Sequence, residues 1–157
     1  MSAYLNILAD IKSHMENVTG IGQVHDYERW NNDPARFIAL FSYTPAGGQK
    51  QVRGWEITRF AVTEHQKGAW WRHHRFRIRG YMGLQDDAAT DKTFQVLIDA
   101  VCDELRAAAN GATWYYMDGD NPENAPAQVE VIEPRIFGSV LCHCAQIALA
   151  VTERIVA

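Results

Sequence analysis

The segment from Trp70 to Met82 constrains the fold more than any other, because its side chains alternate in character with a period of two. One set is basic and the set between it is mainly apolar: His73, Arg75, Arg77 and Arg79 alternate with His74, Phe76, Ile78 and Gly80. Successive side chains of a β-strand point to opposite faces of its sheet. The pattern therefore predicts a half-buried strand with one arginine-rich face.

A second long strand is predicted over residues 139–153. One face carries Leu141, His143, Ala145, Ile147, Leu149 and Val151, and the other carries Cys142, Cys144, Gln146, Ala148, Ala150 and Thr152. Because the second set is mostly small, we expect a helix to pack closely against that face.

Four further strands are predicted from short apolar or aromatic runs between turn signals. Residues 52–63 should pair with 70–82 across a loop near Gly68, and the others are residues 23–30, 36–43 and 129–132. The run Asn31-Asn-Asp-Pro34 separates two of them as a turn, and Asp118 to Pro126 reads as an exposed loop.

Two helices are predicted from apolar residues spaced three or four apart. The first covers residues 4–17 with Ser2 as its N-cap, and the second covers residues 90–109 with Asn110-Gly111 at its C-cap. Their apolar stripes are Tyr4, Leu5, Ile7, Leu8, Ile11 and Met15 in the first helix, and Phe94, Leu97, Ile98, Val101 and Leu105 in the second.

These elements predict an α+β fold, a mostly antiparallel β-sheet covered by two α-helices. The 157 residues lie in the usual range for one domain, so residues 1–157 are taken as a single domain. The N-terminus lacks the pattern of a signal peptide, and no stretch is apolar for long enough to span a bilayer. Three cysteines without framework spacing indicate reduced thiols and synthesis in the cytoplasm.

No catalytic, cofactor or metal site is predicted. Cys142-His143-Cys144 contains residue types that bind zinc, but alternation along a strand points His143 away from both cysteines, and a structural site needs four ligands. Buried thiols are the preferred interpretation. The acidic residues Asp118 and Asp120 are interpreted as solvated turn carboxylates.

The run from Trp70 to Gly80 is the candidate interface, because arginine and tryptophan are favoured where proteins contact one another. The interface hypothesis consists of Trp70, Trp71, Arg72, Arg75, Arg77 and Arg79, with at least one of the two tryptophans expected in the core. A solvated sheet face and a nucleic-acid-binding surface remain as alternatives, the second disfavoured by a net charge of −4.

Charge is divided unevenly along the chain. Residues 1–80 hold 11 Lys/Arg against 7 Asp/Glu, whereas residues 81–157 hold 4 against 12. This asymmetry favours head-to-tail contact between identical subunits, unless the two halves intermix in one fold.

The sequence resembles small tail-completion proteins of tailed bacteriophages, in particular the tail terminators. The resemblance is carried by Val18-Thr-Gly-Ile-Gly-Gln-Val24, His74-x-Phe76-x-Ile78-x-Gly80-Tyr81, Gly83-Leu84, Phe94-x-x-Leu97-Ile98-x-x-Val101-x-x-x-Leu105 and Phe137-Gly138-x-x-Leu141-Cys-His143-x-x-x-Ile147-x-Leu149-x-Val151-x-Glu153.

The resemblance implies a non-enzymatic structural protein that forms a ring, hexameric in the family, and caps the tail tube. Its expected partners are copies of itself, the tail tube protein and a head-completion or neck protein, with passive contact to DNA in the lumen and no membrane. It would reside in the tail or neck region of the virion after assembly in the host cytoplasm. The alternatives are a head-side connector and a small ligand-binding or enzymatic α+β domain.

Overall fold

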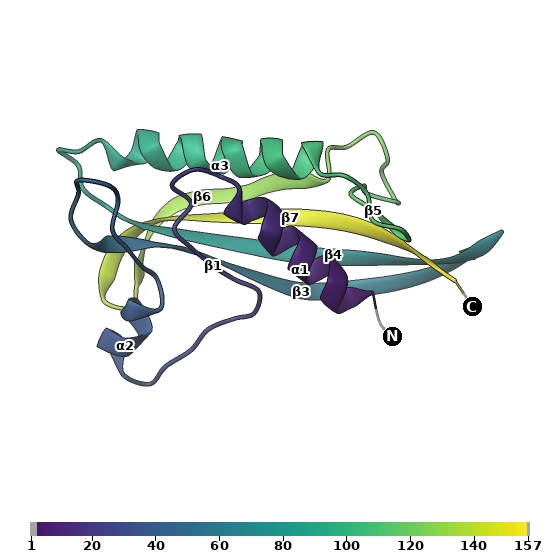
Figure 1. Cartoon of the computed structure of the whole chain (residues 1–157), viewed down its shortest axis with the longest axis horizontal. Helices are drawn as coiled ribbons and strands as arrows, with labels where there is room; N and C mark the ends of the chain where they lie inside the picture. Colours follow the sequence, from purple (N-terminus) through teal and green to yellow (C-terminus); the bar gives the residue numbers. More distant parts are fainter. Residues whose placement is uncertain (1–2, 157) are drawn as a thin grey trace.

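A computed structural model describes residues 3–156, which form one seven-stranded sheet and three helices (Figure 1). In chain order the elements are α1 (Tyr4–Glu16), β1 (Gln23–His25), α2 (Pro34–Ala39), β2 (Ser42–Tyr43), β3 (Gln51–Lys67), β4 (Ala69–Gly83), α3 (Thr90–Ala107), β5 (Trp114–Tyr115), β6 (Ala127–Phe137) and β7 (Val140–Ile155).

The centre of the sheet is the antiparallel trio β3, β4 and β7. β3 and β4 form one long hairpin that turns at Gly68, whose φ of +71° suits glycine. β4 then pairs with β7 from Trp70 opposite Ile155 to Gly83 opposite Cys142. β6 adds antiparallel to β7 on the far side, and β1 is the strand that pairs in parallel, with β3. The predicted α+β, mostly antiparallel fold in a single domain is confirmed.

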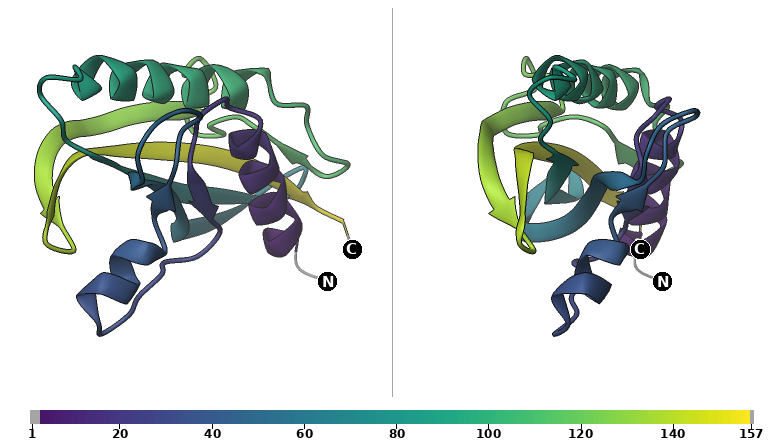
Figure 2. Two further views of the ribbon diagram at one scale, coloured as in Figure 1. Left: turned by 60° about the vertical axis from the view of Figure 1, so that its left-hand side comes forward. Right: turned by 90° about the vertical axis from the view of Figure 1, so that its left-hand side faces the viewer.

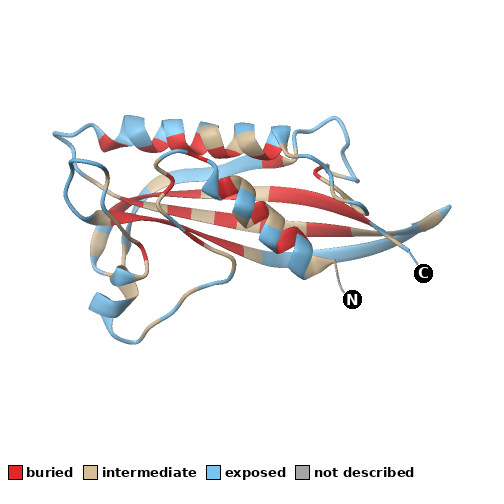
Figure 3. Ribbon diagram, in the orientation of Figure 1, coloured by how far each residue is buried: buried red, intermediate tan, exposed pale blue. Residues whose placement is uncertain are grey.

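Both long helices cover one face of the sheet. Their apolar stripes meet the large side chains of β4 and β7, including Phe76, Ile78, Ile147 and Leu149, in one buried cluster. Figure 3 shows the buried positions on the side of α3 that faces the sheet and at alternate positions along the central strands. The two long helices therefore pack on the face of β7 opposite its small residues, because that face offers more apolar area to bury. The helix that packs at the small-residue face is the short α2, through Phe37 and Ile38.

The short α2 corrects the strand predicted over residues 36–43. The carboxylate of Asp33 accepts hydrogen bonds from the backbone N–H groups of Ala35 and Arg36, and Pro34 occupies the first turn. This is a helix N-terminus and not a strand-linking turn. Phe37 and Ile38 pack beside a second small core of Phe41, Val52, Cys142 and Cys144.

Other boundaries differ by smaller amounts. The strand predicted over residues 23–30 is limited to β1, whereas that predicted over 129–132 extends to the whole of β6. Leu5 was placed on the buried stripe of α1 but is 65% exposed, and Ser2 lies outside the described residues. α3 ends at Ala107, and the Asn110 side chain accepts a hydrogen bond from the Tyr116 N–H.

The sheet is strongly curved, as the end-on view in Figure 2 shows, and the tip of the β3–β4 hairpin projects beyond the helices (Figure 1). Within residues 3–156, no helix is both long enough and apolar enough to cross a membrane.

Candidate functional site

The six residues of the predicted interface do not share one surface. Period-two alternation puts Trp71, Arg75, Arg77 and Arg79 on the face of the sheet away from α1 and α3, here called the outer face. Trp70 and Arg72 lie on the helix-bearing face, where Arg72 binds Glu153 of β7. Neither tryptophan is in the core, since Trp70 is half exposed and Trp71 is partly exposed at the hairpin tip.

Among the arginines of the outer face, Arg75 is bound closely by two acidic residues of the same chain. Arg75 donates to Asp118 at 2.9 Å and to Asp120 at 2.7 Å. The hydrogen bond from Arg75 holds the pKa of the Asp118 carboxyl below its usual value. The prediction of solvated turn carboxylates is therefore wrong for Asp118, which is only 13% exposed beside Arg75, whereas Asp120 stays about half exposed.

Arg77 and Arg79 are less strongly held. The Arg77 guanidinium lies 4.2 Å from the ring centroid of Phe60, and its Nε is 3.9 Å from Glu130. Arg79 forms no ion pair within 4 Å anywhere in residues 3–156. Arg79 is thus the least closely paired member of the row, although Glu56 lies opposite it on β3 and interacts with it electrostatically.

These ion pairs bear on the uneven charge along the chain. Arg72, Arg75 and Arg77 belong to the basic half, and their partners Glu153, Asp118 and Glu130 belong to the acidic half. The two halves thus intermix in one sheet, and part of the asymmetry is neutralised within the subunit.

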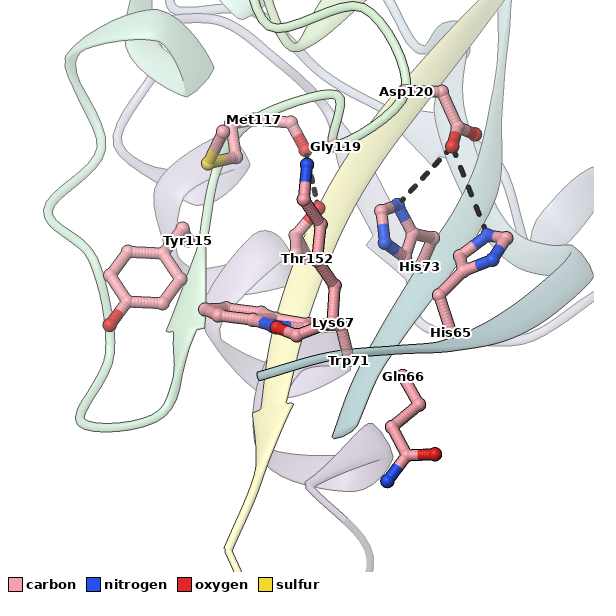
Figure 4. Close-up of a pocket in the computed structure, with 10 residues that line it drawn as sticks. All are labelled: His65, Gln66, Lys67, Trp71, His73, Tyr115, Met117, Gly119, Asp120 and Thr152. Carbon is pink, nitrogen blue, oxygen red and sulfur yellow. Dashed lines mark hydrogen bonds and ion pairs between the residues drawn. The ribbon is translucent and has the colours of Figure 1, made fainter. Parts of the chain in front are cut away.

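A pocket of about 700 Å³ opens on the outer face at the hairpin tip (Figure 4). Its walls include Trp71 and His73 of β4, His65 of β3, Tyr115 of β5 and Asp120 of the following loop. The rings of His65 and His73 meet edge to face with centroids 5.0 Å apart. Burial lowers the pKa of His73 below its ordinary value, so its imidazole is neutral near pH 7.

The pocket was not predictable from a local sequence motif, because its residues form none. A usable signal exists in the hairpin register: with the turn at Gly68, both His65 and His73 fall on the outer face. The contribution of Asp120 has no such signal, since it depends on how the loop after β5 folds.

The Cys142-His143-Cys144 segment has the alternating geometry that its strand position predicts. His143 lies against α3, where its Nε2 is 2.8 Å from the Thr90 hydroxyl, whereas both cysteines are buried in the small core on the other face. Burial raises the pKa of Cys142 to about 12 and that of Cys144 to about 11. Such thiols are poor nucleophiles and poor ligands at neutral pH.

The sheet has two long open edges. On one side, residues 59–67 of β3 are exposed and pair only with β4 among the described residues. On the other side, β6 pairs only with β7 and is exposed over most of its length. Exposed apolar side chains lie on both segments, namely Phe60 and Val62 on β3 and Val129, Val131 and Ile132 on β6.

The fold and these surfaces define a class, an α+β protein whose curved antiparallel sheet ends in two open edges of different sequence. No protein-family model matches the chain, and no curated protein matches its sequence.

Proposed function

We propose that the chain is a structural subunit of a tailed bacteriophage, a tail terminator that assembles as a hexameric ring on the end of the tail tube. Two features support the proposal: the resemblance of the sequence to tail terminators, and the two open edges at opposite sides of the sheet. The edges are the main support, because pairing between them can join folded monomers into a ring.

A ring requires a heterologous interface, in which one surface of a subunit binds a different surface of the next. Residues 59–67 of β3 and the outer edge of β6 are such a pair. Backbone N–H and C=O groups of one edge can pair with those of the other, which extends the sheet from subunit to subunit. Long open edges in a natural protein are otherwise a liability for aggregation.

The two ends of the subunit offer separate surfaces for other proteins. The hairpin tip lies at one end and α2 lies at the other (Figure 1). Near α2, the exposed residues Trp30 and Ile136 line one groove. In the proposed ring these ends would meet the tail tube protein and a head-completion protein. This role needs no catalysis, and it puts the protein in the tail or neck of the virion, with DNA passing through the lumen.

The test is particle mass by light scattering after size exclusion, followed by electron microscopy of the protein mixed with tail tubes of the same phage. A particle near six times 17.8 kDa that sits on tube ends supports the proposal. Protein that leaves tube ends bare at saturating concentration contradicts it. Binding to portal-bearing heads in place of tubes would assign the protein to the head-side connectors.

A further inference from the structure

The hairpin tip brings together three potential metal ligands from three segments of the chain. His65 lies near the end of β3, His73 near the start of β4, and Asp120 in the loop that follows β5. Their ligand atoms all lie within 4.8 Å of one another. Figure 4 shows both imidazoles directed at the same carboxylate oxygen.

His73 Nδ1 is a buried polar atom without a hydrogen-bond partner. The residue is only 8% exposed, and Asp120 Oδ1 is 3.9 Å away. That separation is beyond hydrogen-bonding range. A buried, unsatisfied nitrogen is uncommon in folded proteins, and a bound ion is one of its recognised explanations.

The carboxylate of Asp120 is held in position by its neighbours. Arg75 binds its Oδ2 at 2.7 Å, which leaves Oδ1 to face the two imidazoles. Asp118 accepts the backbone N–H of Asp120 at 3.0 Å and fixes this part of the loop. Gly119 allows the loop to approach closely, because a Cβ there would collide with the ring of His73.

We propose that His65 Nε2, His73 Nδ1 and Asp120 Oδ1 bind one divalent transition-metal ion, with Zn²⁺ the best match. Two imidazole nitrogens and a carboxylate are ordinary zinc ligands with bond lengths of about 2.0–2.2 Å. Two such bonds placed end to end reach about 4.2 Å, which spans the 3.9 Å from each imidazole nitrogen to Asp120 Oδ1. Ligand atoms that lie up to 4.8 Å apart must move closer together to bind the same ion. The fourth position of a tetrahedral site is left to water or to an external ligand.

The ion links the projecting hairpin to the loop over residues 118–126. Because the unfolded chain does not hold the three ligands together, zinc binding stabilises the folded arrangement by mass action. This inference concerns one chain alone and does not depend on ring formation or on tail binding.

Titration calorimetry of tag-free protein with zinc chloride tests the site, using His65→Ala and Asp120→Asn. Both side chains are about half exposed, so neither change opens the core. His14→Ala is the matched control, because His14 lies between the carboxylates of Asp10 and Glu104 at 3.8 and 3.1 Å on another surface. We expect one zinc per chain in the wild type and in His14→Ala, with affinity at least about tenfold weaker in the other two variants.

Limited trypsin digestion provides a second measurement, because Lys67 sits at the hairpin tip beside the ligands. Zinc should slow cleavage after Lys67 in the wild type and in His14→Ala but not in His65→Ala. Absence of a saturable zinc site, or equal affinity in all four proteins, would overturn the proposal. Should Asp120→Asn loosen the loop through Arg75, the result for His65→Ala is decisive, since the His65 side chain forms no hydrogen bond within residues 3–156.

Discussion

His74 Nε2 lies 2.9 Å from Glu153 Oε2, and both residues are buried where β4 meets β7. On the other side of the ring, Nδ1 faces Arg59 Nη1 at 3.3 Å. Since arginine only donates, Nδ1 accepts, and the proton of a neutral ring is therefore on Nε2 and is donated to Glu153. The direction of the pKa agrees, because burial lowers the pKa of His74 despite the nearby carboxylate.

Glu153 also binds Arg72 at 3.3 Å, so replacing it leaves two donors without their acceptor. We expect Glu153→Ala to lower the free energy of unfolding by about 3 kcal/mol, the scale for breaking a buried pair. Urea unfolding followed by circular dichroism measures this change. Glu64→Ala is the control, because Glu64 binds the same arginine from an exposed position and should cost less than about 1 kcal/mol. If both substitutions lower the free energy of unfolding equally, the buried pair stabilises the fold no more than the exposed pair does.

Glu56 is expected to make stability depend on pH. Its carboxyl is 4% exposed and accepts the Arg29 N–H at 3.0 Å, and burial raises its pKa above the ordinary 4.5. A raised carboxyl pKa means that the folded protein binds the proton more tightly than the unfolded protein does. At a pH above the pKa of the folded state, the ionised Glu56 therefore lowers the free energy of unfolding. Glu56→Gln should therefore be more stable than the wild type near pH 7.

The advantage of Glu56→Gln should shrink as the pH falls toward 4.5 and vanish below it, where the wild-type carboxyl is neutral in both states. Thermal melts at a series of pH values measure the difference between the two proteins. Glu123→Gln, at an exposed loop position, should show no such trend. A difference for Glu56→Gln that stays constant with pH would contradict the assigned cause.

The three cysteines should react in two classes. Burial raises the pKa of all three thiols, but Cys102 is partly exposed on α3 whereas Cys142 and Cys144 are buried. With a pKa of about 12, only about one Cys142 thiol in ten thousand is ionised at pH 8. We expect a thiol reagent to modify one site per native chain, a site lost in Cys102→Ser, and three sites after denaturation. Peptide mapping that finds native Cys142 modified first would exclude this assignment.

The long strands were predictable from sequence because each alternates over many residues. His73 to Gly80 and Leu141 to Val151 alternate for long enough that one face must be buried. The structure buries the apolar set in both segments except Leu141, which is 51% exposed near the start of β7. The stripe of α3 was predictable for the same reason, since all five of its apolar residues are buried.

Features that depend on one local contact or on a loop were not predictable in this way. The segment from Pro34 to Ala39 is too short for a clear period, and Asp33-Pro34 suits both a turn and a helix start. The loop that carries Asp118 and Asp120 reads as polar and exposed, but Arg75 draws it onto the outer face. Only tertiary structure joins His65, His73 and Asp120, which are distant in sequence.

The two open edges give a prediction about assembly that distinguishes a ring from other oligomers. Lysine on an open edge opposes pairing because its charge would be buried in the joint. Val62→Lys on β3 and Val131→Lys on β6 should each prevent ring formation, while the monomer stays folded because both side chains are exposed. Val96→Lys, on the exposed side of α3, should leave the ring intact.

Mixing the two edge variants then reveals which surfaces meet. Val62→Lys keeps a native β6 edge and Val131→Lys keeps a native β3 edge, so a head-to-tail joint can form once between the two proteins and no further. Light scattering of the equimolar mixture should therefore give the mass of two chains, although each variant alone gives the mass of one. If β6 instead paired with β6 in a two-fold dimer, Val62→Lys alone would still be dimeric and mixing would add nothing. That outcome would remove the heterologous joint on which the ring depends.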